Sequence, residues 1–403
     1  MEIYISANEN KNVNDIDFEL VERKGVGHPD TICDAIAEIA SKNYSKYCIK
    51  KFGNPAHHWF DKVMLIGGEA DIEYGKGNIL KPYTVIFAGK VSYFIGNEKI
   101  PVENILLDSA SEVLENVLTG FDKSKHIIIE NKLVDYQGAG RKSSRYRPQN
   151  SEVLPQLSNE NLVSNDTNLV SAYAPLSILE SIVLKVERYI NGKEFKKINF
   201  DTGWDVKVFG TRKQDKYELL VNMPFLANHI ESLEKYFLRK SEVEKNILDF
   251  LKKNFNVSIK LMMNATDRNG QAYLTALGSV ADTGDVGVVG RGNRMNGLIT
   301  PMRPMSIEAP AGKNPVDHTG KLYGVLANRI AEKVNKDLGI PVEVHIYTAK
   351  ETKLIDPDKI IVKLAANDIN STTVKSVKLR VESLVHSVGD ISKTLIFEGI
   401  TMW

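Results

Sequence analysis

Predicted strands and helices follow one another in mixed order along this chain, and that order is the feature that most limits its fold. Two pairs of predicted strands are consecutive, residues 62–72 with 83–95 and residues 205–209 with 217–223. The segment 177–190 is an amphipathic helix, because its apolar residues recur every three or four positions. Strict alternation of strand and helix, which indicates a doubly wound parallel sheet, is absent. The order therefore predicts an α+β fold, with sheets covered by helices on one face.

Other segments of the chain predict an arm, two strands and a helix. Residues 4–17 are polar and predict a frayed arm, whereas β-branched and apolar residues predict strands at 272–281 and 395–400. A helix is predicted from about Asp30 to Tyr47, with Asp30 as a candidate cap at its start. No internal repeat and no low-complexity tract stands out in the sequence.

The charges of the chain are balanced, with 52 lysines and arginines against 51 aspartates and glutamates. This balance gives no reason to expect nucleic acid or an anionic membrane as a partner. Cys33 and Cys48 form no CxxC pair, which argues against a disulfide framework or a structural zinc site. No apolar run is long enough to span a bilayer, and the polar N-terminus does not resemble a secretory signal. We expect a reduced, cytoplasmic protein in which any anionic ligand meets a local positive site.

The segment GVGHPDTICD, residues 25–34, is the first candidate for chemistry. Its glycines allow a ligand to approach the backbone closely. Asp30 and Asp34 are four residues apart and share one face of the predicted helix. His28 and the helix N-terminus suit phosphate oxygens, and a carboxylate suits Mg²⁺. The alternative is a capped helix with an incidental histidine, and spacing alone leaves it open.

A glycine-dense segment, TGDVGVVGRGNRMNG at residues 283–297, is the second candidate. Backbone N–H groups of such a segment bind anions, and Arg291 and Arg294 can clamp phosphate oxygens. The pattern matches neither the P-loop nor the dinucleotide-binding fingerprint. A flexible linker is the alternative.

The loop AGKNPVDHTG, residues 311–320, is a weaker candidate that precedes a predicted helix. Lys313 supplies a cation, Asp317 a candidate metal ligand and His318 a polar contact. His318 can instead cap the helix. The loop adds to a phosphate site only if the stronger segments lie near it.

Shorter signals add candidate ligand contacts. Asp205 and Lys207 alternate with valines, so they share one face of a predicted strand and can reach a ribose hydroxyl and a phosphate. Asp166 lies in the turn SNDTN, and Glu69 follows two glycines at the mouth of a strand. Each has a structural alternative, namely a surface ion pair, a turn or a solvated acid. Together the segments predict a phosphate-rich, Mg²⁺-bound ligand, and they give no reaction.

Several stretches, in this order, resemble the archaeal-type branch of the methionine adenosyltransferases. They are VERKGVGHPDTICD, SNDTN followed by YAPLS, GDVGVVGRGNRMNGLITPMRPMS and EAPAGKNPVDHTGKLY. The resemblance extends from about residue 21 to residue 327, and the block at 284–320 is long enough to be specific. The chain departs from the family pattern in the loop YQGAGRKSSRYRPQN and at AKETK, residues 349–353.

The resemblance implies three interlocked α+β domains with approximate threefold pseudosymmetry. The implied domains are discontinuous: residues 1–20 with 176–281, residues 21–131 with 282–320, and residues 132–175 with 321–403. The resemblance also implies a homo-oligomer, a dimer or a dimer of dimers, with active sites at the subunit interface.

The implied reaction joins ATP and L-methionine. Methionine sulfur attacks C5′ of ATP, and the tripolyphosphate leaves and is hydrolysed to pyrophosphate and phosphate. A leaving group of this charge needs positive groups aimed where negative charge develops, whereas sulfur needs no strong base. Mg²⁺ and K⁺ are the implied cofactors.

The resemblance also assigns roles to residues of this chain. The implied catalytic residues, which meet the leaving phosphates, are His28, Lys207, Arg291 and Lys313. The implied contacts to ATP and its phosphates are Gln137, Gly138, Gly140, Asp205, Arg294 and His318. The implied contacts to methionine or the adenosyl part are Glu69, Asp166 and Asp285. Asp30 would hold Mg²⁺, with Asp317 a weaker candidate for a second metal position.

Two other functions stay open from the sequence. A phosphotransferase or triphosphate hydrolase would keep the phosphate site and change the acceptor, and the altered loops at 135–150 and 349–353 are its support. A catalytically silent regulatory subunit is the other, although it would have no chemical need for His28, Asp30 and Lys207 together. The products made from ATP and methionine discriminate among the three.

Overall fold

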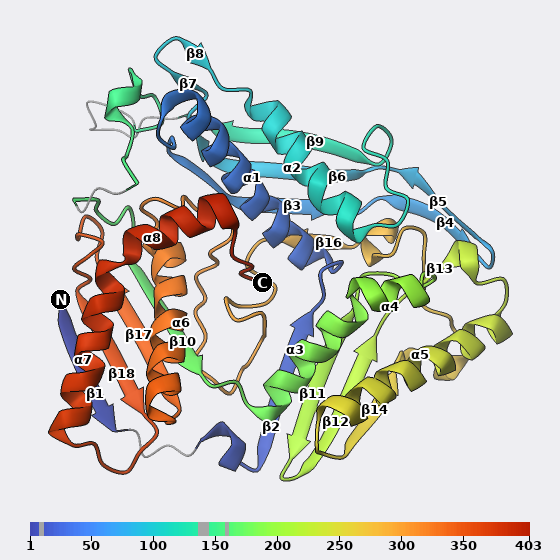
Figure 1. Cartoon of the computed structure of the whole chain (residues 1–403). Coiled ribbons are helices and arrows are strands. Elements are labelled where there is room, and N and C mark those ends of the chain that lie inside the picture. The colour runs from blue at the N-terminus through green and yellow to red at the C-terminus, as the bar shows by residue number, and fades with distance from the viewer. Residues whose placement is uncertain (8–11, 136–144, 158–160) are drawn as a thin grey trace.

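The computed structural model describes residues 1–7, 12–135, 145–157 and 161–403. Within these ranges twelve strands form three four-stranded sheets, and each sheet carries helices on one face (Figure 1). The predicted α+β class is confirmed. None of the described helices combines the length and the apolar character that a membrane span requires.

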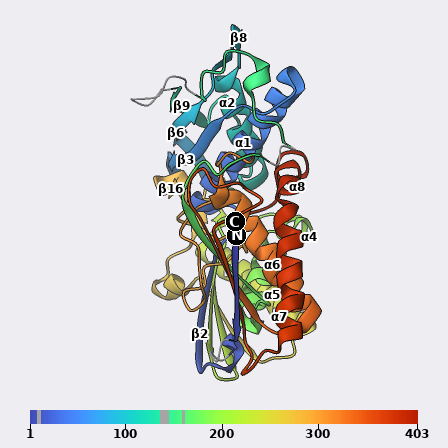
Figure 2. The same cartoon turned by 90° about the vertical axis from the view of Figure 1, so that its left-hand side faces the viewer.

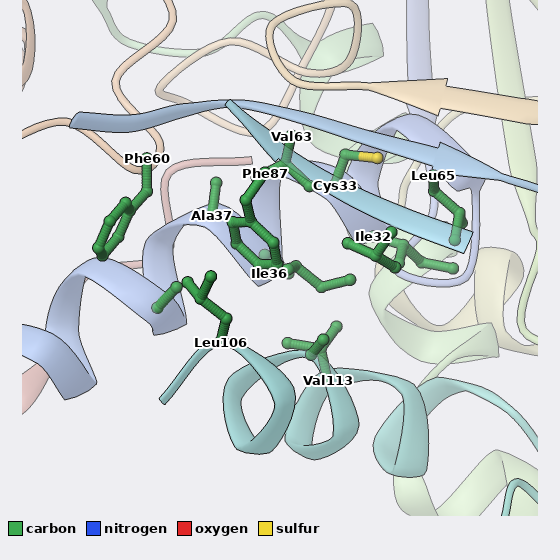
Figure 3. Packing of buried hydrophobic residues seen from close by; sticks show 14 of the residues in the cluster. Ile32, Cys33, Ile36, Ala37, Phe60, Val63, Leu65, Phe87, Leu106 and Val113 are labelled. Atoms are coloured by element: carbon green, nitrogen blue, oxygen red, sulfur yellow. The ribbon is translucent and has the colours of Figure 1, made fainter. Parts of the chain in front are cut away.

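The first sheet lies at the top of Figure 1 and has the strand order β16-β3-β6-β9. Its strands are β3 (His58–Ile66), β6 (Tyr83–Val91), β9 (Ile127–Val134) and β16 (Val286–Val288). Two hairpins belong to the same region, β4 (Glu69–Glu73) with β5 (Lys76–Lys81) and β7 (Phe94–Ile95) with β8 (Glu98–Lys99). Helices α1 (Pro29–Phe52) and α2 (Val102–Val117) cover one face of this sheet. Figure 3 shows Ile32 and Ile36 of α1 between Leu65 of the sheet and Val113 of α2.

The second sheet has the strand order β14-β12-β11-β2. Its strands are β2 (Phe18–Lys24), β11 (Lys207–Lys213), β12 (Lys216–Asn222) and β14 (Ile259–Met263), and its helices are α3 (Ile178–Ile190), α4 (Lys193–Ile198) and α5 (Leu233–Asn254). The predicted strand pair at 205–223 is the antiparallel pair β11–β12. Helix α3 begins with a capping box between Ser177 and Glu180, which pairs two backbone N–H groups of the first turn.

The third sheet has the strand order β1-β18-β17-β10. Its strands are β1 (Glu2–Ala7), β10 (Asn168–Ala174), β17 (Val342–Thr348) and β18 (Lys359–Leu364), and its helices are α6 (Thr319–Leu338), α7 (Ser371–His386) and α8 (Val388–Lys393). The predicted frayed arm at residues 4–17 is wrong for residues 4–7, which belong to β1, because β1 pairs in parallel with β18. Ile3 and Ile5 pack against the core of this unit, which a mostly polar segment does not reveal. The implied threefold relation and the domain boundaries stay predictions.

Two other predicted strands are wrong in whole or in part. Residues Thr394–Glu398 form a π-helix, with Leu395 and Ile396 buried, in place of the strand at 395–400. Only β15 (Leu274–Thr275) of the segment 272–281 is a strand, paired with β13 (Phe225–Leu226). Gly278 follows with φ of +113°, a conformation that ends the extended run. Short apolar runs fit a strand and a buried turn equally well, which explains both errors.

Each sheet has a second face that no described helix covers. Figure 2 shows α1, α6, α7 and α8 towards one side of the molecule, and β2, β3, β6 and β9 towards the other. Alternate strand residues point to this second face, and several of them are large, apolar and exposed. They are Tyr4, Phe18, Leu20, Met64, Ile66, Ile128, Leu169 and Tyr347.

Candidate active site

The turn that carries His28 connects the end of β2 to the start of α1. It lies flat against residues 204–206, and glycine is required for this contact. A Cβ on Gly25 would lie 2.4 Å from the carbonyl oxygen of Val206, and a Cβ on Gly27 would lie 2.5 Å from the carbonyl carbon of Trp204. The two glycines of the motif therefore bring the N-terminus of α1 next to the start of β11.

His28, rather than Asp30, is the N-cap of α1, which corrects the predicted cap. The Nδ1 atom of His28 accepts a hydrogen bond from the backbone N–H of Asp30 at 3.2 Å. Burial lowers the pKa of His28 to about 4, so the ring is neutral near pH 7. Since Nδ1 accepts, the ring proton is on Nε2, which leaves a donor for a ligand.

Asp30 is the second residue of α1, and both of its carboxylate oxygens accept hydrogen bonds. Oδ1 accepts from the backbone N–H of Val288 at 2.9 Å, and Oδ2 accepts from Nζ of Lys24 at 2.7 Å. Burial alone would raise the pKa of Asp30, but these hydrogen bonds outweigh it and hold the pKa below its ordinary value. Asp30 is therefore ionised at neutral pH.

His28, Asp205 and Lys207 line one cavity of about 300 Å³. The remaining lining residues are Asn222, Asn264, Thr266, Tyr273 and Val280. Lys207 begins β11 and lies opposite Lys24 of β2 in the sheet, so two ammonium groups approach this end of it. Glu22 contacts Lys207 at 3.1 Å and offsets part of that charge.

Asp205 precedes β11 instead of lying within it, but it lines the same cavity as Lys207. Its Oδ2 atom accepts from the backbone N–H of Val280 at 3.0 Å and from the hydroxyl of Ser279 at 3.3 Å. Burial raises the pKa of Asp205 to about 7. A carboxyl group can donate a hydrogen bond to a hydroxyl when it is protonated and accept one when it is ionised, and both forms are present near this pKa.

The glycine-dense segment lies on the first turns of α1 rather than forming a flexible linker. A Cβ on Gly287 would be 2.1 Å from the carbonyl oxygen of Pro29, so only glycine fits there. Asp34 Oδ1 accepts from the backbone N–H of Gly290 at 2.9 Å. Arg291 follows with an exposed side chain, whereas Arg294 donates to the carbonyl of Gly290 at 3.1 Å.

Lys313 is buried and held between two carboxylates that sequence reasoning missed. Its Nζ lies 2.7 Å from Asp61 and 2.6 Å from Glu308. Burial alone would lower the pKa of Lys313, but the two carboxylates outweigh it and raise the pKa above its ordinary value. Asp61 escapes detection because β3 shifts register between Trp59 and Lys62, which turns an acid in a strand inward.

Asp317 and His318 lie at the start of α6. Asp317 accepts from the side-chain amide of Asn165 at 2.9 Å and from Arg145 at 3.3 Å, and burial raises its pKa. His318 is the N-cap of α6 and accepts from the backbone N–H of Gly320 at 3.2 Å, so the capping alternative is confirmed. Burial lowers the pKa of His318 to about 3.

The three residues predicted at the methionine end lie at or near the surface. Glu69 begins β4, is exposed and pairs with Lys81. Asp285 is exposed just before β16, and the backbone N–H of Gly67 donates to its carbonyl oxygen at 3.0 Å. Asp166 is half-buried, and its carboxylate accepts from the next backbone N–H. Gln137, Gly138 and Gly140 lie outside the described residues.

The predicted residues therefore form two groups. The first, which we call the His28 group, contains His28, Asp30, Asp205 and Lys207, with Arg291 beside it through the hydrogen bond of Lys24 to the Arg291 carbonyl. The second, the Lys313 group, contains Lys313, Asp317 and His318. Among the described residues no cluster of three or more His, Cys, Asp or Glu side chains could hold a metal ion alone.

Comparisons with known proteins give similarity to S-adenosylmethionine synthetases along almost the whole chain. The family described as S-adenosylmethionine synthetase (AdoMet synthetase) matches residues 1–398. An S-adenosylmethionine synthase of Sulfolobus acidocaldarius is 39% identical over 400 residues, which cover 97% of this chain and 96% of that protein. Another from Aeropyrum pernix is 37% identical, over 94% of this chain and 92% of that protein.

The fold also resembles a solved structure, that of an unusual S-adenosylmethionine synthetase from Campylobacter jejuni. The TM-score is 0.55 at 13% sequence identity, over 94% of this chain and 93% of that chain. This likeness concerns the fold alone. The family match covers residues 1–398, and one relative is 39% identical over 97% of the chain. The chain therefore belongs to the S-adenosylmethionine synthetase family.

Proposed function

We propose that this chain makes S-adenosylmethionine from ATP and L-methionine and then hydrolyses the tripolyphosphate to pyrophosphate and phosphate. The observation that carries the proposal is the cavity between His28, Asp205 and Lys207 at the N-terminus of α1. A helix N-terminus and an ammonium group suit phosphates, and a carboxyl group at the same cavity suits ribose hydroxyls. A nucleotide triphosphate meets both requirements at once.

The cations of the site act on the leaving group. Methionine sulfur is already a good nucleophile, so the reaction needs orientation and stabilisation of the departing tripolyphosphate. Neutral His28 donates its Nε2–H to a phosphate oxygen, and Lys207, Arg291 and Lys313 supply positive charge, with Arg294 as a helper. His318 and the segment with Gln137, Gly138 and Gly140 contact ATP. Glu69, Asp166 and Asp285 receive methionine or the adenosyl part.

Asp30 is the proposed Mg²⁺ ligand. Mg²⁺ is commonly held by one or two carboxylates together with substrate phosphates, and this suits a site with no described three-residue cluster. Lys24 already occupies Oδ2 of Asp30, so Lys24 would give way when the metal binds. Mg²⁺ held there would neutralise charge on the phosphates. Asp317 is the weaker candidate, for a second metal position, because Asn165 and Arg145 already bind it. K⁺ is proposed as a further cofactor without assigned ligands.

We propose a homo-oligomer, a dimer or a dimer of dimers, in which the uncovered sheet faces meet. Phe18 and Leu20 of β2 are 55% and 52% exposed, and Leu169 of β10 is 61% exposed. Exposed apolar patches of this kind mark interfaces. The His28 group lies at the end of one such face, because Lys207 and Lys24 point to it. A second copy can therefore add its Lys313 group and complete the site.

Product analysis tests the function. Purified protein is incubated with ATP, methionine, Mg²⁺ and K⁺, and products are identified by mass spectrometry and phosphate assay, with a reaction without methionine as control. We expect S-adenosylmethionine together with equal amounts of pyrophosphate and phosphate. Phosphate release without a sulfonium product would indicate a triphosphate hydrolase instead. No turnover at all would indicate a silent subunit.

A further inference from the structure

Helix α1 has a buried acidic face in addition to its apolar one. Asp30, Asp34 and Glu38 recur every four residues, so they lie on one face of the helix, and each is about 5% exposed or less. The apolar residues Ile32 and Ile36 point elsewhere, towards the sheet and α2 (Figure 3). Buried carboxylates are costly unless they are hydrogen-bonded. The acidic face therefore requires partners.

The partners are backbone N–H groups of two segments that are distant from α1 in sequence, one at the end of β16 and after it and the other in the turn that precedes α6. Asp30 accepts from Val288 at 2.9 Å, Asp34 from Gly290 at 2.9 Å, and Glu38 from Gly312 at 3.0 Å. One turn further along α1, the hydroxyl oxygen of Ser41 lies 3.2 Å from the carbonyl oxygen of Lys313. The same helix face thus holds the loop of Arg291 and the turn of Lys313.

A buried lysine secures the second of these contacts. Lys321 of α6 is fully buried, lies 2.6 Å from Glu38 and donates to the carbonyl of Lys313 at 2.8 Å. Gly312 is forced close to the sheet, since a Cβ there would be 2.5 Å from the carbonyl of Phe60. The backbone on both sides of Lys313 is consequently fixed by α1, α6 and β3.

We propose that Asp34 and Glu38 are positioning residues for the reaction, and this inference rests on the proposed function. Asp34 fixes the backbone immediately before Arg291. Glu38, with Lys321, fixes the backbone of the turn that carries Lys313. Neither carboxylate touches substrate, and each acts by aiming a cation at the leaving phosphates. Misplacement of a positioned group by about 1 Å can lower turnover about 100-fold.

Substitutions at Asp34 test the proposal. Asp34→Ala removes the acceptor of the Gly290 N–H, and we expect kcat to fall about 100-fold while KM for methionine stays near the wild-type value. Asp34→Asn keeps an acceptor oxygen of the same reach, and we expect it to recover most of the lost kcat. Asp34→Leu fills the space without an acceptor, so it replaces Asp34→Ala if that variant does not fold. Wild-type kcat in Asp34→Ala or Asp34→Leu overturns the proposal.

Arg291→Ala, alone and combined with Asp34→Ala, shows through which residue Asp34 acts. If Asp34 positions Arg291, the second substitution adds little to the first, because both remove the same contribution. Losses that multiply, with Arg291→Ala itself impaired, overturn positioning and leave the proposed function standing. Unimpaired Arg291→Ala overturns the proposed role of Arg291 and this inference with it.

A matched control separates positioning from general loss of stability. Asp201 is a buried carboxylate whose two oxygens are held by Arg239 of α5, at 2.6 Å and 2.9 Å. Asp201→Ala should lower the melting temperature and leave kcat at the wild-type level. A fall of kcat in Asp201→Ala equal to that in Asp34→Ala would overturn the proposal, because the effect would then be one of stability.

Discussion

His28 has two tasks that belong to different ends of one imidazole ring. Nδ1 caps α1 by accepting from Asp30, and Nε2 carries the proton that we propose His28 donates to a phosphate in the cavity that it lines. Because serine is also a good N-cap, His28→Ser should keep the helix start and remove the donor. The two tasks can therefore be separated by substitution.

We predict that His28→Ala and His28→Ser both lower turnover about 100-fold or more, as expected when one donor to a developing charge is lost. His28→Ala should also lower the free energy of unfolding by about 1 kcal/mol, whereas His28→Ser should not. Steady-state kinetics and denaturant unfolding measure the two effects. Near-normal turnover in His28→Ser would contradict the assigned role.

Burial also determines the charge of His58, whose ring lies between Ser41 and the carbonyl of Ala56. Burial lowers the pKa of His58 from 6.5 to about 3. The unfolded chain takes up a proton below pH 6.5 that the folded chain refuses, so this contribution to stability is present above pH 6.5 and lost as pH falls towards 3.

We predict that lowering the pH from about 7.5 to about 5 destabilises the wild type by about 2 kcal/mol more than it destabilises His58→Gln. The other titrating groups are shared by both proteins, so the difference isolates His58. Urea midpoints at the two pH values measure it. Parallel losses of stability in the two proteins would count against a neutral, buried His58.

Single residues of the site could be predicted where they belong to a recognisable sequence motif. The glycines, His28, Asp30, Asp205 and Lys207 all belong to motifs, and the structure gathers these four polar residues around one turn. Asp61 and Glu308 could not be found this way, because an isolated acid in a strand or loop looks like a solvated charge. The contacts of Asp61 and Glu308 depend on a bulge in β3 and on the placement of Lys313 between them, which local spacing does not encode.

At the scale of elements, periodic segments were predicted well and irregular ones were not. Helix α3 and strand β17 follow from their patterns, because each has an apolar face of sufficient length. Strand β1 and the π-helix Thr394–Glu398 were mispredicted, since their states are set by partners far away in the chain. The stacking of the glycine-dense segment on α1 is likewise a tertiary contact.

The packing of the glycine-dense segment on α1 predicts that a single added methyl group at Gly287 is destabilising. Gly287→Ala places a Cβ against the carbonyl of Pro29, where there is no room, and we expect a loss of about 1–3 kcal/mol of stability with reduced turnover. Gly389→Ala is the matched control, because its nearest atom would be 3.6 Å away and alanine favours helix α8. Thermal unfolding compares the two. A Gly287→Ala protein as stable and active as Gly389→Ala would contradict the packing.

At the scale of the whole molecule, the uncovered sheet faces predict self-association. Leu20→Glu introduces a charge on the exposed face of β2 and should disrupt the oligomer and lower activity at low protein concentration. Leu379→Glu is the control, because Leu379 is 67% exposed on α7, among the helices on the opposite side. Light scattering after size-exclusion chromatography measures the mass. An unchanged oligomer in Leu20→Glu would place the interface elsewhere.

In the proposed oligomer, the His28 group of one copy and the Lys313 group of another complete each site. The most direct measurement is the turnover of mixed oligomers of His28→Ala and Lys313→Ala, co-expressed with different tags. In a twofold-symmetric dimer, half of the molecules are mixed and each mixed dimer holds one intact site, so we predict about a quarter of wild-type turnover. Mixed dimers, isolated through both tags, that are as inactive as either variant alone would contradict the claim.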